Sequence, residues 1–355
     1  SDLFIIHSSI VNYKNEILLA KEIKERFNGK IGFIGPFSTV CSNLYSKYVD
    51  FIVIGEPEKA IMDISISNNI PKGLVQSESI IDIDKLPFPN WDGFPILNYD
   101  FKPILKRKNF LVMSSSRGCS LFCNYCPYIV SFKKFRKRDT KKIVDEIEYL
   151  HSKYKMKSLL FRDQTFTFDR GWVVDIAKGI LKRNLSIEWS CETRLDFLDK
   201  ELLDLLSSSG LKHIGVGIES FDDKILRSST RKPINNKHQE EMIKYCDKIG
   251  VSVLANYIFG FPTDTKENIL KTIKYAKKLN TPFAAFNIFT PYPGTKFYEI
   301  MKDKIYEDFE KFTTSHPVFH HNNLSKEDFL KLREKAYIQY YFRPRWFLKY
   351  GFRYR

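Results

Sequence analysis

The sequence predicts an α/β protein in which a truncated doubly wound α/β domain precedes a partial parallel (β/α)6 barrel. Short apolar runs alternate with amphipathic stretches along most of the chain, and this alternation is typical of parallel βαβ units. A proline-rich stretch at 80–108 interrupts the alternation once. Three strand–helix units precede that stretch, about half of an ordinary doubly wound domain, and six follow it.

The interruption leads us to expect four segments. They are a partial Rossmann-like domain at 1–80, a proline-rich linker at 81–109, the barrel at 110–300, and a C-terminal helical lid with a basic aromatic tail at 301–355. Prolines and aspartates in the linker favour extended chain over helix. Because the chain begins at Ser1, directly before an apolar strand-like run, we expect further residues upstream.

Within the barrel segment, apolar strands and amphipathic helices are expected to alternate. The expected strands are 110–114, 158–162, 187–191, 213–218, 251–259 and 284–290. The expected helices are 140–154, 171–183, 199–208, 237–249 and 266–278. Polar candidate residues follow these strands at their C-terminal ends, the face on which a parallel barrel carries its functional site.

Composition and charge set broad limits on function. Hydrophobic residues make up 43% of the 355 residues, enough for a substantial core. The net charge of +15 suits nucleic acid, an anionic membrane surface or an acidic substrate, and it equally suits solvated faces of a lysine-rich protein. Six cysteines, half of them in one loop, do not form a secreted disulfide framework, so we expect a cytoplasmic protein.

The most informative motif is the run Arg117-Gly118-Cys119-Ser-Leu-Phe-Cys123-Asn-Tyr125-Cys126-Pro127. It places three thiols at C-x3-C-x2-C spacing, and soft thiolates select zinc or an iron–sulfur cluster. A structural zinc site would need a fourth ligand at similar spacing, but the next candidates, His151 and Cys191, lie far along the chain. Three ligands on a four-iron cluster would leave one iron open to a small molecule.

This loop, with an aromatic residue directly before its last cysteine, resembles the cluster loop of the radical S-adenosylmethionine (SAM) superfamily. The resemblance implies that Cys119, Cys123 and Cys126 hold a [4Fe-4S] cluster and act in catalysis. It also implies that the open iron binds the amino and carboxylate groups of SAM. Tyr125 would pack against the cluster and the adenine side of SAM, and Gly118 would allow a tight turn before the first ligand.

Later strand ends resemble the same superfamily in the same order. Asp163 and Gln164 stand where the family holds the SAM amino group, although the commoner Gly-Gly-Glu is absent at this point of the sequence. Glu192-Thr-Arg194 resembles the motif whose guanidinium faces the SAM carboxylate. The further SAM contacts that the resemblance implies are Glu219, Ser220 and Gly260. Taken singly, each has an ordinary structural explanation, such as an ion pair or a turn.

The first segment resembles the second half of the cobalamin-binding domain that is fused to many radical SAM enzymes. The resemblance is carried by Gly35-Pro36 and by the stretch 49–58, which contains Gly55-Glu56-Pro57-Glu58. The familiar Asp-x-His-x-x-Gly motif is absent from the sequence, and the neighbours of His7 indicate a core or strand-end histidine. The sequence leaves open whether cobalamin is bound.

The resemblance implies an enzyme that cleaves SAM reductively to a 5′-deoxyadenosyl radical for C–H activation, with cobalamin-dependent methyl transfer to an unactivated carbon as one outcome. Its partners would be a small-molecule or lipid-like substrate and a one-electron donor of the flavodoxin or ferredoxin type. Two alternatives stay open. One is a tRNA-modifying, methylthiotransferase-like enzyme that uses the basic surface on nucleic acid, and the other is a non-catalytic iron–sulfur protein.

The other cysteines and the tail receive simpler interpretations. Cys41, Cys191 and Cys246 lie in apolar helices or strands and are expected to be buried and inert. The tail 337–355 alternates aromatic with basic residues, and we favour packing against the barrel. Contact with a membrane surface and stacking on nucleic acid are the alternatives for the tail.

Overall fold

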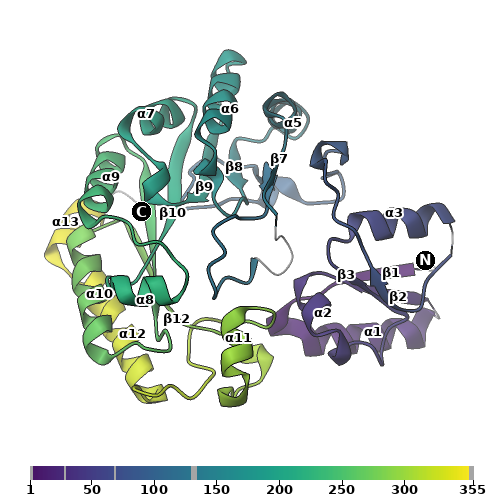
Figure 1. Ribbon diagram of the computed structural model, residues 1–355. Coiled ribbons are helices and arrows are strands. Elements are labelled where there is room, and N and C mark those ends of the chain that lie inside the picture. The colour runs from purple at the N-terminus through teal and green to yellow at the C-terminus, as the bar shows by residue number, and fades with distance from the viewer. Residues whose placement is uncertain (1–2, 28, 68, 129–133, 352–355) are drawn as a thin grey trace. The chain divides into compact units, whose positions relative to one another are not determined.

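The computed structural model describes residues 3–27, 29–67, 69–128 and 134–351 (Figure 1). The chain forms two compact units, each built from three segments. Unit 1 comprises Ser1–Asp82, Gly118–Lys134 and Thr290–His321. Unit 2 comprises Ile83–Arg117, Phe135–Phe289 and Asn322–Arg355. The four sequence segments stay a prediction, because compactness alone does not define a domain.

Unit 1 contains a parallel sheet of four strands in the order β1-β2-β3-β4. The strands are β1 (Leu3–His7), β2 (Lys30–Ile34), β3 (Phe51–Ile54) and β4 (Gly73–Gln76). The prediction of a parallel α/β domain is confirmed, but β4 was not expected, because its four largely exposed residues carry little apolar signal. Spatial order follows chain order, so the described strands contain no reversal of the kind that marks a topological switch point.

Helices cover both faces of this sheet. They are α1 (Tyr13–Phe27), α2 (Pro36–Val40) and α3 (Glu58–Ser67). Side chains alternate along β3, so Ile52 packs in the core formed with α1 and α2, whereas Phe51 and Val53 pack against α3. In Figure 1, α3 accordingly lies on the opposite side of the sheet from α1 and α2. The two-sided coverage is typical of a Rossmann-like domain.

Residues from the C-terminal third also belong to unit 1. This segment contains α11 (Lys296–Met301) and a short 3-10 turn, Phe309–Lys311. The Tyr13 hydroxyl donates to Asp308 at 3.0 Å, and the Lys14 ammonium lies 2.7 Å from a Glu310 carboxylate oxygen. The Phe309 ring packs against Phe37 with centroids 5.3 Å apart. Unit 1 therefore joins residues nearly 300 positions apart in sequence.

Unit 2 is built on six parallel strands in the order β12-β11-β10-β9-β8-β5, which confirms the predicted set of six. The strands are β5 (Phe110–Met113), β8 (Ser158–Phe161), β9 (Glu188–Thr193), β10 (Leu211–Glu219), β11 (Ser252–Phe259) and β12 (Phe283–Ile288). Each strand pairs with the next one along the chain, and among the described residues no ladder joins β5 to β12. The sheet is therefore an open, partial barrel.

Helices cover the outer face of this sheet (Figure 1). They are α5 (Thr140–Lys153), α6 (Arg170–Lys182), α7 (Lys200–Ser208), α9 (Asn236–Lys248) and α10 (Lys266–Leu279), with the short, unexpected α8 (Asp223–Ser228) between β10 and α9. Each begins after a capping side chain that accepts a backbone N–H from its first turn. The capping residues are Asp139, Asp169, Asp199, Asp222, Asn235 and Thr265.

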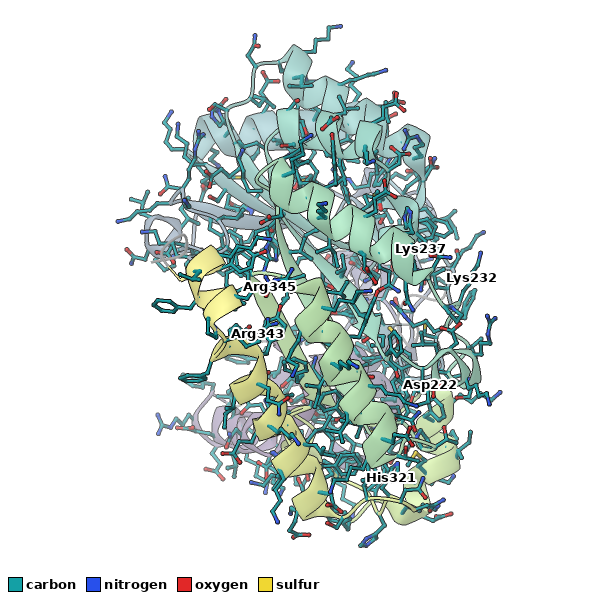
Figure 2. The ribbon with its side chains drawn as sticks, turned by 90° about the vertical axis from the view of Figure 1, so that its left-hand side faces the viewer. Asp222, Lys232, Lys237, His321, Arg343 and Arg345 are labelled. Carbon is teal, nitrogen blue, oxygen red and sulfur yellow. The ribbon has the colours of Figure 1, made fainter. Side chains whose placement is uncertain are left out.

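The tail packs into the core of unit 2, as expected. The tail helices are α12 (Lys326–Tyr341), which begins with the predicted capping box at Ser325, and α13 (Pro344–Tyr350). Tyr340 is fully buried, and its hydroxyl donates to the Thr281 carbonyl at 2.6 Å. Arg343 donates to the Lys277 carbonyl at the end of α10, at 2.7 Å, and α12 runs alongside α10 (Figure 2). Among the described residues, no helix has the length and apolarity that a membrane span requires.

Two aromatic residues of the tail should differ sharply in their contribution to stability. Y340F removes the donor to the Thr281 carbonyl inside the core and should lower the free energy of unfolding by about 1–3 kcal/mol. F342S changes a side chain that is 85% exposed and should change the free energy by less than about 0.5 kcal/mol. Urea unfolding of both variants measures the difference, and equal effects would contradict a packed tail.

Candidate functional site

The three-cysteine loop lies between two short strands that pair antiparallel. These are β6 (Ser116–Arg117), which ends directly before the loop, and β7 (Arg136–Lys137), which follows it. Gly118 has φ +86° and Phe122 has φ +48°, so the backbone is left-handed both before the first cysteine and between the first two. The Cys126 N–H donates to the Cys123 carbonyl at 3.0 Å. Gly118 thus has a backbone conformation that suits glycine, whereas the turns of the loop lie at 120–121 and 124–125, so the tight turn expected at Gly118 stays a prediction.

The three thiols of this loop have the chemistry of iron–sulfur ligands, but among the described residues no three His, Cys, Asp or Glu side chains are gathered as a metal site. Cys123 is buried, whereas Cys119 and Cys126 are half-buried, and none of the three is in a disulfide. Cysteine thiolates are the usual protein ligands of such clusters. Tyr125, which directly precedes the last cysteine, is half-buried. Its expected contact with the cluster and SAM stays a prediction.

Asp163 follows β8 and is almost fully buried. Its carboxylate accepts the Ser115 N–H at 3.1 Å, the Ser115 hydroxyl at 3.0 Å and the Ser116 hydroxyl. Burial raises the pKa of Asp163 despite these hydrogen bonds. Asp163 therefore holds the segment that leads into β6 and the cysteine loop, a role that sequence reasoning missed. The expected contact with the SAM amino group stays a prediction.

Gln164 differs from its neighbour in its surroundings. Its side-chain oxygen Oε1 is buried and has no hydrogen-bond partner in the described structure. Buried polar atoms of a native protein usually have a partner, and one that does not is often explained by an absent ligand or water. An unpaired acceptor at this strand end suits a bound ammonium or amide group.

Arg194 follows β9 and is held by the chain itself. Its guanidinium donates to both carboxylate oxygens of Asp196 at 2.9 Å and to the Lys232 carbonyl at 3.0 Å. These bonds set the plane of the buried guanidinium, and the bidentate pair with Asp196 escaped sequence reasoning. The expected contact with the SAM carboxylate stays a prediction.

Glu219, the last residue of β10, has an uncommon left-handed backbone with φ +64°. Its carboxylate oxygen Oε1 lies 3.6 Å from Nη1 of Arg231, and both side chains are nearly buried. Arg231 also donates to the Gly217 carbonyl, so this ion pair braces the end of β10. The Ser220 hydroxyl accepts the Asp222 N–H at 3.1 Å. The sequence offered no local signal for Arg231, which lies twelve positions beyond Glu219.

Gly260, directly after β11, occupies a position that only glycine fits. Its φ is +91°, and a Cβ atom there would lie 2.5 Å from the Phe329 ring. The N–H groups of Gly260 and Phe261 donate to one carboxylate oxygen of Asp264, at 2.8 and 3.2 Å. Asp264 is almost fully buried, and burial raises its pKa to about 7. The buried carboxylate of Asp264 thus holds this turn. In the sequence, its position four residues after Gly260 is the one signal for that role.

The structure brings the expected strand-end residues to one edge of the unit 2 sheet. Asp163 and Gln164 follow β8, Arg194 follows β9, Glu219 and Ser220 end or follow β10, and Gly260 follows β11. These four strands are parallel neighbours, so their carboxyl ends share one edge. At that edge lie the buried carboxylates of Asp163 and Glu219, the guanidinium of Arg194 and the glycine turn at Gly260.

The other cysteines are buried, as expected. Cys191 and Cys246 lie in the core of unit 2, and Cys41 lies in the core of unit 1. Burial raises the pKa of Cys41 to about 11 and that of Cys246 to about 12. Because the thiolate is the reactive form, these thiols are inert at neutral pH.

Unit 1 contains a hollow of about 400 Å³ at the carboxyl ends of β1 and β2. Its lining residues are mostly apolar or aromatic and are His7, Ser8, Ser9, Ile10, Pro36, Phe37, Val40, Pro127, Tyr128, Tyr292 and Pro293. Pro127 and Tyr128 directly follow the third cysteine in sequence. Gly35 has φ +111°, and a Cβ atom there would lie 3.1 Å from both His7 Nε2 and Ser8 Oγ. His7 ends β1, which confirms the expected strand-end histidine.

Comparison with known proteins agrees with this arrangement. Residues 113–276 match the model of the radical SAM superfamily. An uncharacterised methyltransferase of Pyrococcus horikoshii is 31% identical over 315 residues, which cover 86% of this chain and 66% of that protein. The bacteriochlorophyllide d C-12(1)-methyltransferase of Chlorobaculum tepidum is 24% identical over 348 residues, which cover 95% of this chain and 75% of that protein. The chain spans about two thirds of the length of these relatives.

Two solved structures share the fold. The radical SAM methyltransferase TsrM of Kitasatospora setae, solved with cobalamin and a [4Fe-4S] cluster, superposes with a TM-score of 0.69 at 14% identity, covering 85% of this chain and 64% of that one. The cobalamin-dependent SAM radical enzyme OxsB, solved with aqua-cobalamin and SAM, superposes with a TM-score of 0.73 at 12% identity, covering 96% and 59%. At such low identity the likeness establishes the fold.

The buried carboxylate of Asp264 should make stability depend on pH. Its pKa is about 7 in the folded protein against an ordinary value of 3.8, so the folded state binds the proton more tightly. The contribution of this group to the free energy of unfolding is therefore full below pH 4, declines as the pH rises to about 7, and is level above. D264N should lessen the decline between pH 5 and pH 8 by about 2 kcal/mol in urea unfolding. The exposed variant D223N should leave the decline unchanged, and an unchanged decline in D264N would contradict the assignment.

Proposed function

We propose that this enzyme, a member of the radical SAM superfamily, cleaves SAM at a [4Fe-4S] cluster and uses the resulting radical to activate a C–H bond of a small-molecule substrate. The observation that carries the proposal is the three-cysteine loop, which lies within the residues that match the superfamily. When bound and reduced by an external one-electron donor, the cluster supplies one electron to SAM, whose S–C5′ bond breaks to give methionine and the 5′-deoxyadenosyl radical.

The cysteine loop and the end of β8 have separate roles in this proposal. Cys119, Cys123 and Cys126 hold the cluster and leave one iron for SAM. Gln164 offers a buried acceptor to the SAM amino group. Asp163 acts through its bonds to Ser115 and Ser116, which place the start of the loop, and is thus a positioning residue.

The residues at the ends of β9, β10 and β11 are assigned to the carboxylate, ribose and adenine of SAM. We assign the guanidinium of Arg194, which Asp196 holds in place, to the SAM carboxylate. Glu219 and Ser220 lie at the strand end assigned to the ribose and carboxylate. We assign Gly260 to the adenine by its place directly after β11; the space that a side chain there would take is filled by the Phe329 ring.

We further propose that the enzyme uses cobalamin and transfers a methyl group to carbon. The hollow of unit 1 supports this, because it lies at the carboxyl ends of β1 and β2, the edge at which open parallel sheets bind ligands, although the described strands have no switch point. Its apolar lining suits one face of a macrocycle, and two of its residues directly follow Cys126. When bound, methylcobalamin would supply the methyl group. Both relatives described above are methyltransferases by name, and TsrM and OxsB were solved with cobalamin.

Loss of any one cluster ligand should abolish SAM cleavage. C119S, C123S and C126S should each lose most of the iron bound after anaerobic reconstitution and form no 5′-deoxyadenosine with SAM and dithionite. C246A changes a core cysteine outside the loop and should keep both iron and activity. Formation of 5′-deoxyadenosine by a variant without all three ligands would contradict the proposal. Salt-sensitive retention of tRNA would instead favour the nucleic-acid alternative.

Filling the hollow of unit 1 should prevent cobalamin binding without affecting the cluster. V40W places an indole in the hollow and should reduce the corrin absorbance that co-elutes with the protein by about tenfold, a loss of about 1.4 kcal/mol. V40A enlarges the hollow, and L18W adds the same ring at an exposed position of α1, so both should retain cobalamin. Equal retention by V40W and L18W would contradict this site, whereas iron content should be the same in all three.

A further inference from the structure

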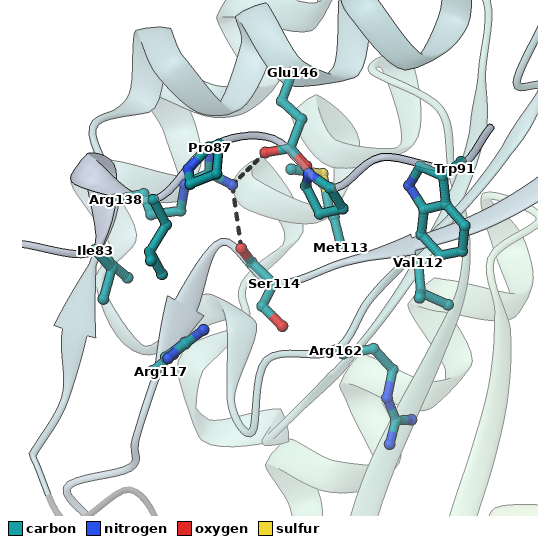
Figure 3. Close-up of a pocket in the computed structure, with 12 residues that line it drawn as sticks. Ile83, Pro87, Trp91, Val112, Met113, Ser114, Arg117, Arg138, Glu146 and Arg162 are labelled. Atoms are coloured by element: carbon teal, nitrogen blue, oxygen red, sulfur yellow. Dashed lines mark hydrogen bonds and ion pairs between the residues drawn. The ribbon is translucent and has the colours of Figure 1, made fainter. Parts of the chain in front are cut away.

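A second hollow, of about 280 Å³, lies within unit 2 along the edge strand β5 (Figure 3). The proline-rich segment 83–91 supplies one side of it through Ile83, Leu86, Pro87, Pro89 and Trp91. The ends of β5 and β8 supply the other side, together with Arg117, Arg138 and Glu146. None of the proposed SAM contacts lines this hollow. Three arginines and one carboxylate line it, and two carboxylates outside the lining, Asp84 and Glu192, also pair with these arginines.

One of the three arginines is already neutralised. Nη1 of Arg138 lies 2.5 Å from Oε2 of Glu146, and Nε lies 3.5 Å from Oδ1 of Asp84. Arg138 also donates to the Ser114 carbonyl at 3.3 Å, as the dashed lines in Figure 3 show. All of these side chains are largely buried, and burial raises the pKa of Glu146. This group is a structural ion pair that ties the proline-rich segment to α5, and it adds no net positive charge.

The other two arginines face a different part of the hollow. In Figure 3, Arg117 and Arg162 lie on the side away from Glu146. Arg162 is anchored at the end of β8 by its N–H bond to the Met113 carbonyl at 2.8 Å. Its guanidinium lies 3.9 Å from Glu192, and both side chains are about half exposed, at 46% and 53%. An ion pair that long and that exposed is weak, so Arg162 can exchange Glu192 for a ligand at little cost.

Trp91 provides an independent observation. Its indole Nε1–H is buried and has no hydrogen-bond partner in the described structure. Figure 3 shows this nitrogen on the side of the ring that faces the other lining residues. Because an indole nitrogen can only donate, an acceptor is needed to satisfy it. A buried donor without a partner is costly, and a bound oxygen atom would remove that cost.

We propose that this hollow binds a small acidic ligand through its carboxylate or phosphate group. Arg162 pairs with the oxyanion in the bidentate geometry that a planar guanidinium favours, and Arg117 adds a second positive charge. The Trp91 N–H donates to another oxygen of the same ligand. The proposal goes beyond the proposed function and does not depend on it.

The experiment measures thermal unfolding of the full chain with inorganic phosphate or malonate, against chloride at equal ionic strength. Either oxyanion at tenfold its dissociation constant should raise the unfolding midpoint by about 2 °C. R162M should weaken binding about tenfold, R162K less, and W91F about threefold. E192Q removes the competing carboxylate and should tighten binding, a result that a misfolded variant cannot give. A response to one oxyanion alone identifies the ligand's acidic group.

The control R227M changes an exposed arginine outside the hollow and should bind as the unaltered chain does. An equal shift with chloride, or unchanged binding in R162M, would overturn the proposal. C119S should keep the phosphate shift, because the hollow does not contain the cysteines. Loss of SAM cleavage with the shift retained therefore counts against the proposed function alone. Absence of the shift with SAM cleavage retained counts against this hollow alone.

Discussion

The parallel pairing of six successive strands is the constraint on which the arrangement of unit 2 depends. Because Met113 pairs with Phe161 and Phe161 with Cys191, the residues that follow these strands emerge at one edge. Alternation then sends Arg162 toward an open hollow and its neighbour Asp163 into a buried network. A shift of β8 by one residue would exchange the positions of the Arg162 and Asp163 side chains, so the strand register determines which of the two charged groups is exposed.

Most of the fold follows from local patterns, whereas the interactions that hold the strand ends do not. The six strands of unit 2 and the capping box at Ser325 were predictable, because apolar runs and capping residues act on near neighbours. The short β4 and α8 were not predicted, because each contains too few apolar residues to produce a recognisable periodic pattern. The pairing of Arg231 with Glu219 and of the two serines with Asp163 could not be predicted, because these contacts depend on the tertiary structure and not on a local sequence pattern.

The same limit applies to the candidate site. A motif names residue types at strand ends, but it does not say whether a side chain faces a ligand or another part of the chain. Arg194 and Asp163 are both bound to protein groups, whereas Gln164 keeps an unsatisfied acceptor. A site whose charged groups are fixed by neighbouring residues is preorganised, and little reorganisation is then required when a ligand arrives.

The bond between Tyr13 and Asp308 has a consequence for the order of folding. It closes a loop of nearly 300 residues, so unit 1 cannot be completed until most of the chain has left the ribosome. Unit 2 also draws on the last segment of the chain, yet its strands pair in the order of their synthesis. Nascent chains should therefore form much of the six-stranded sheet of unit 2 before unit 1 makes its contacts with the segment around Asp308, because distant contacts form more slowly than local ones.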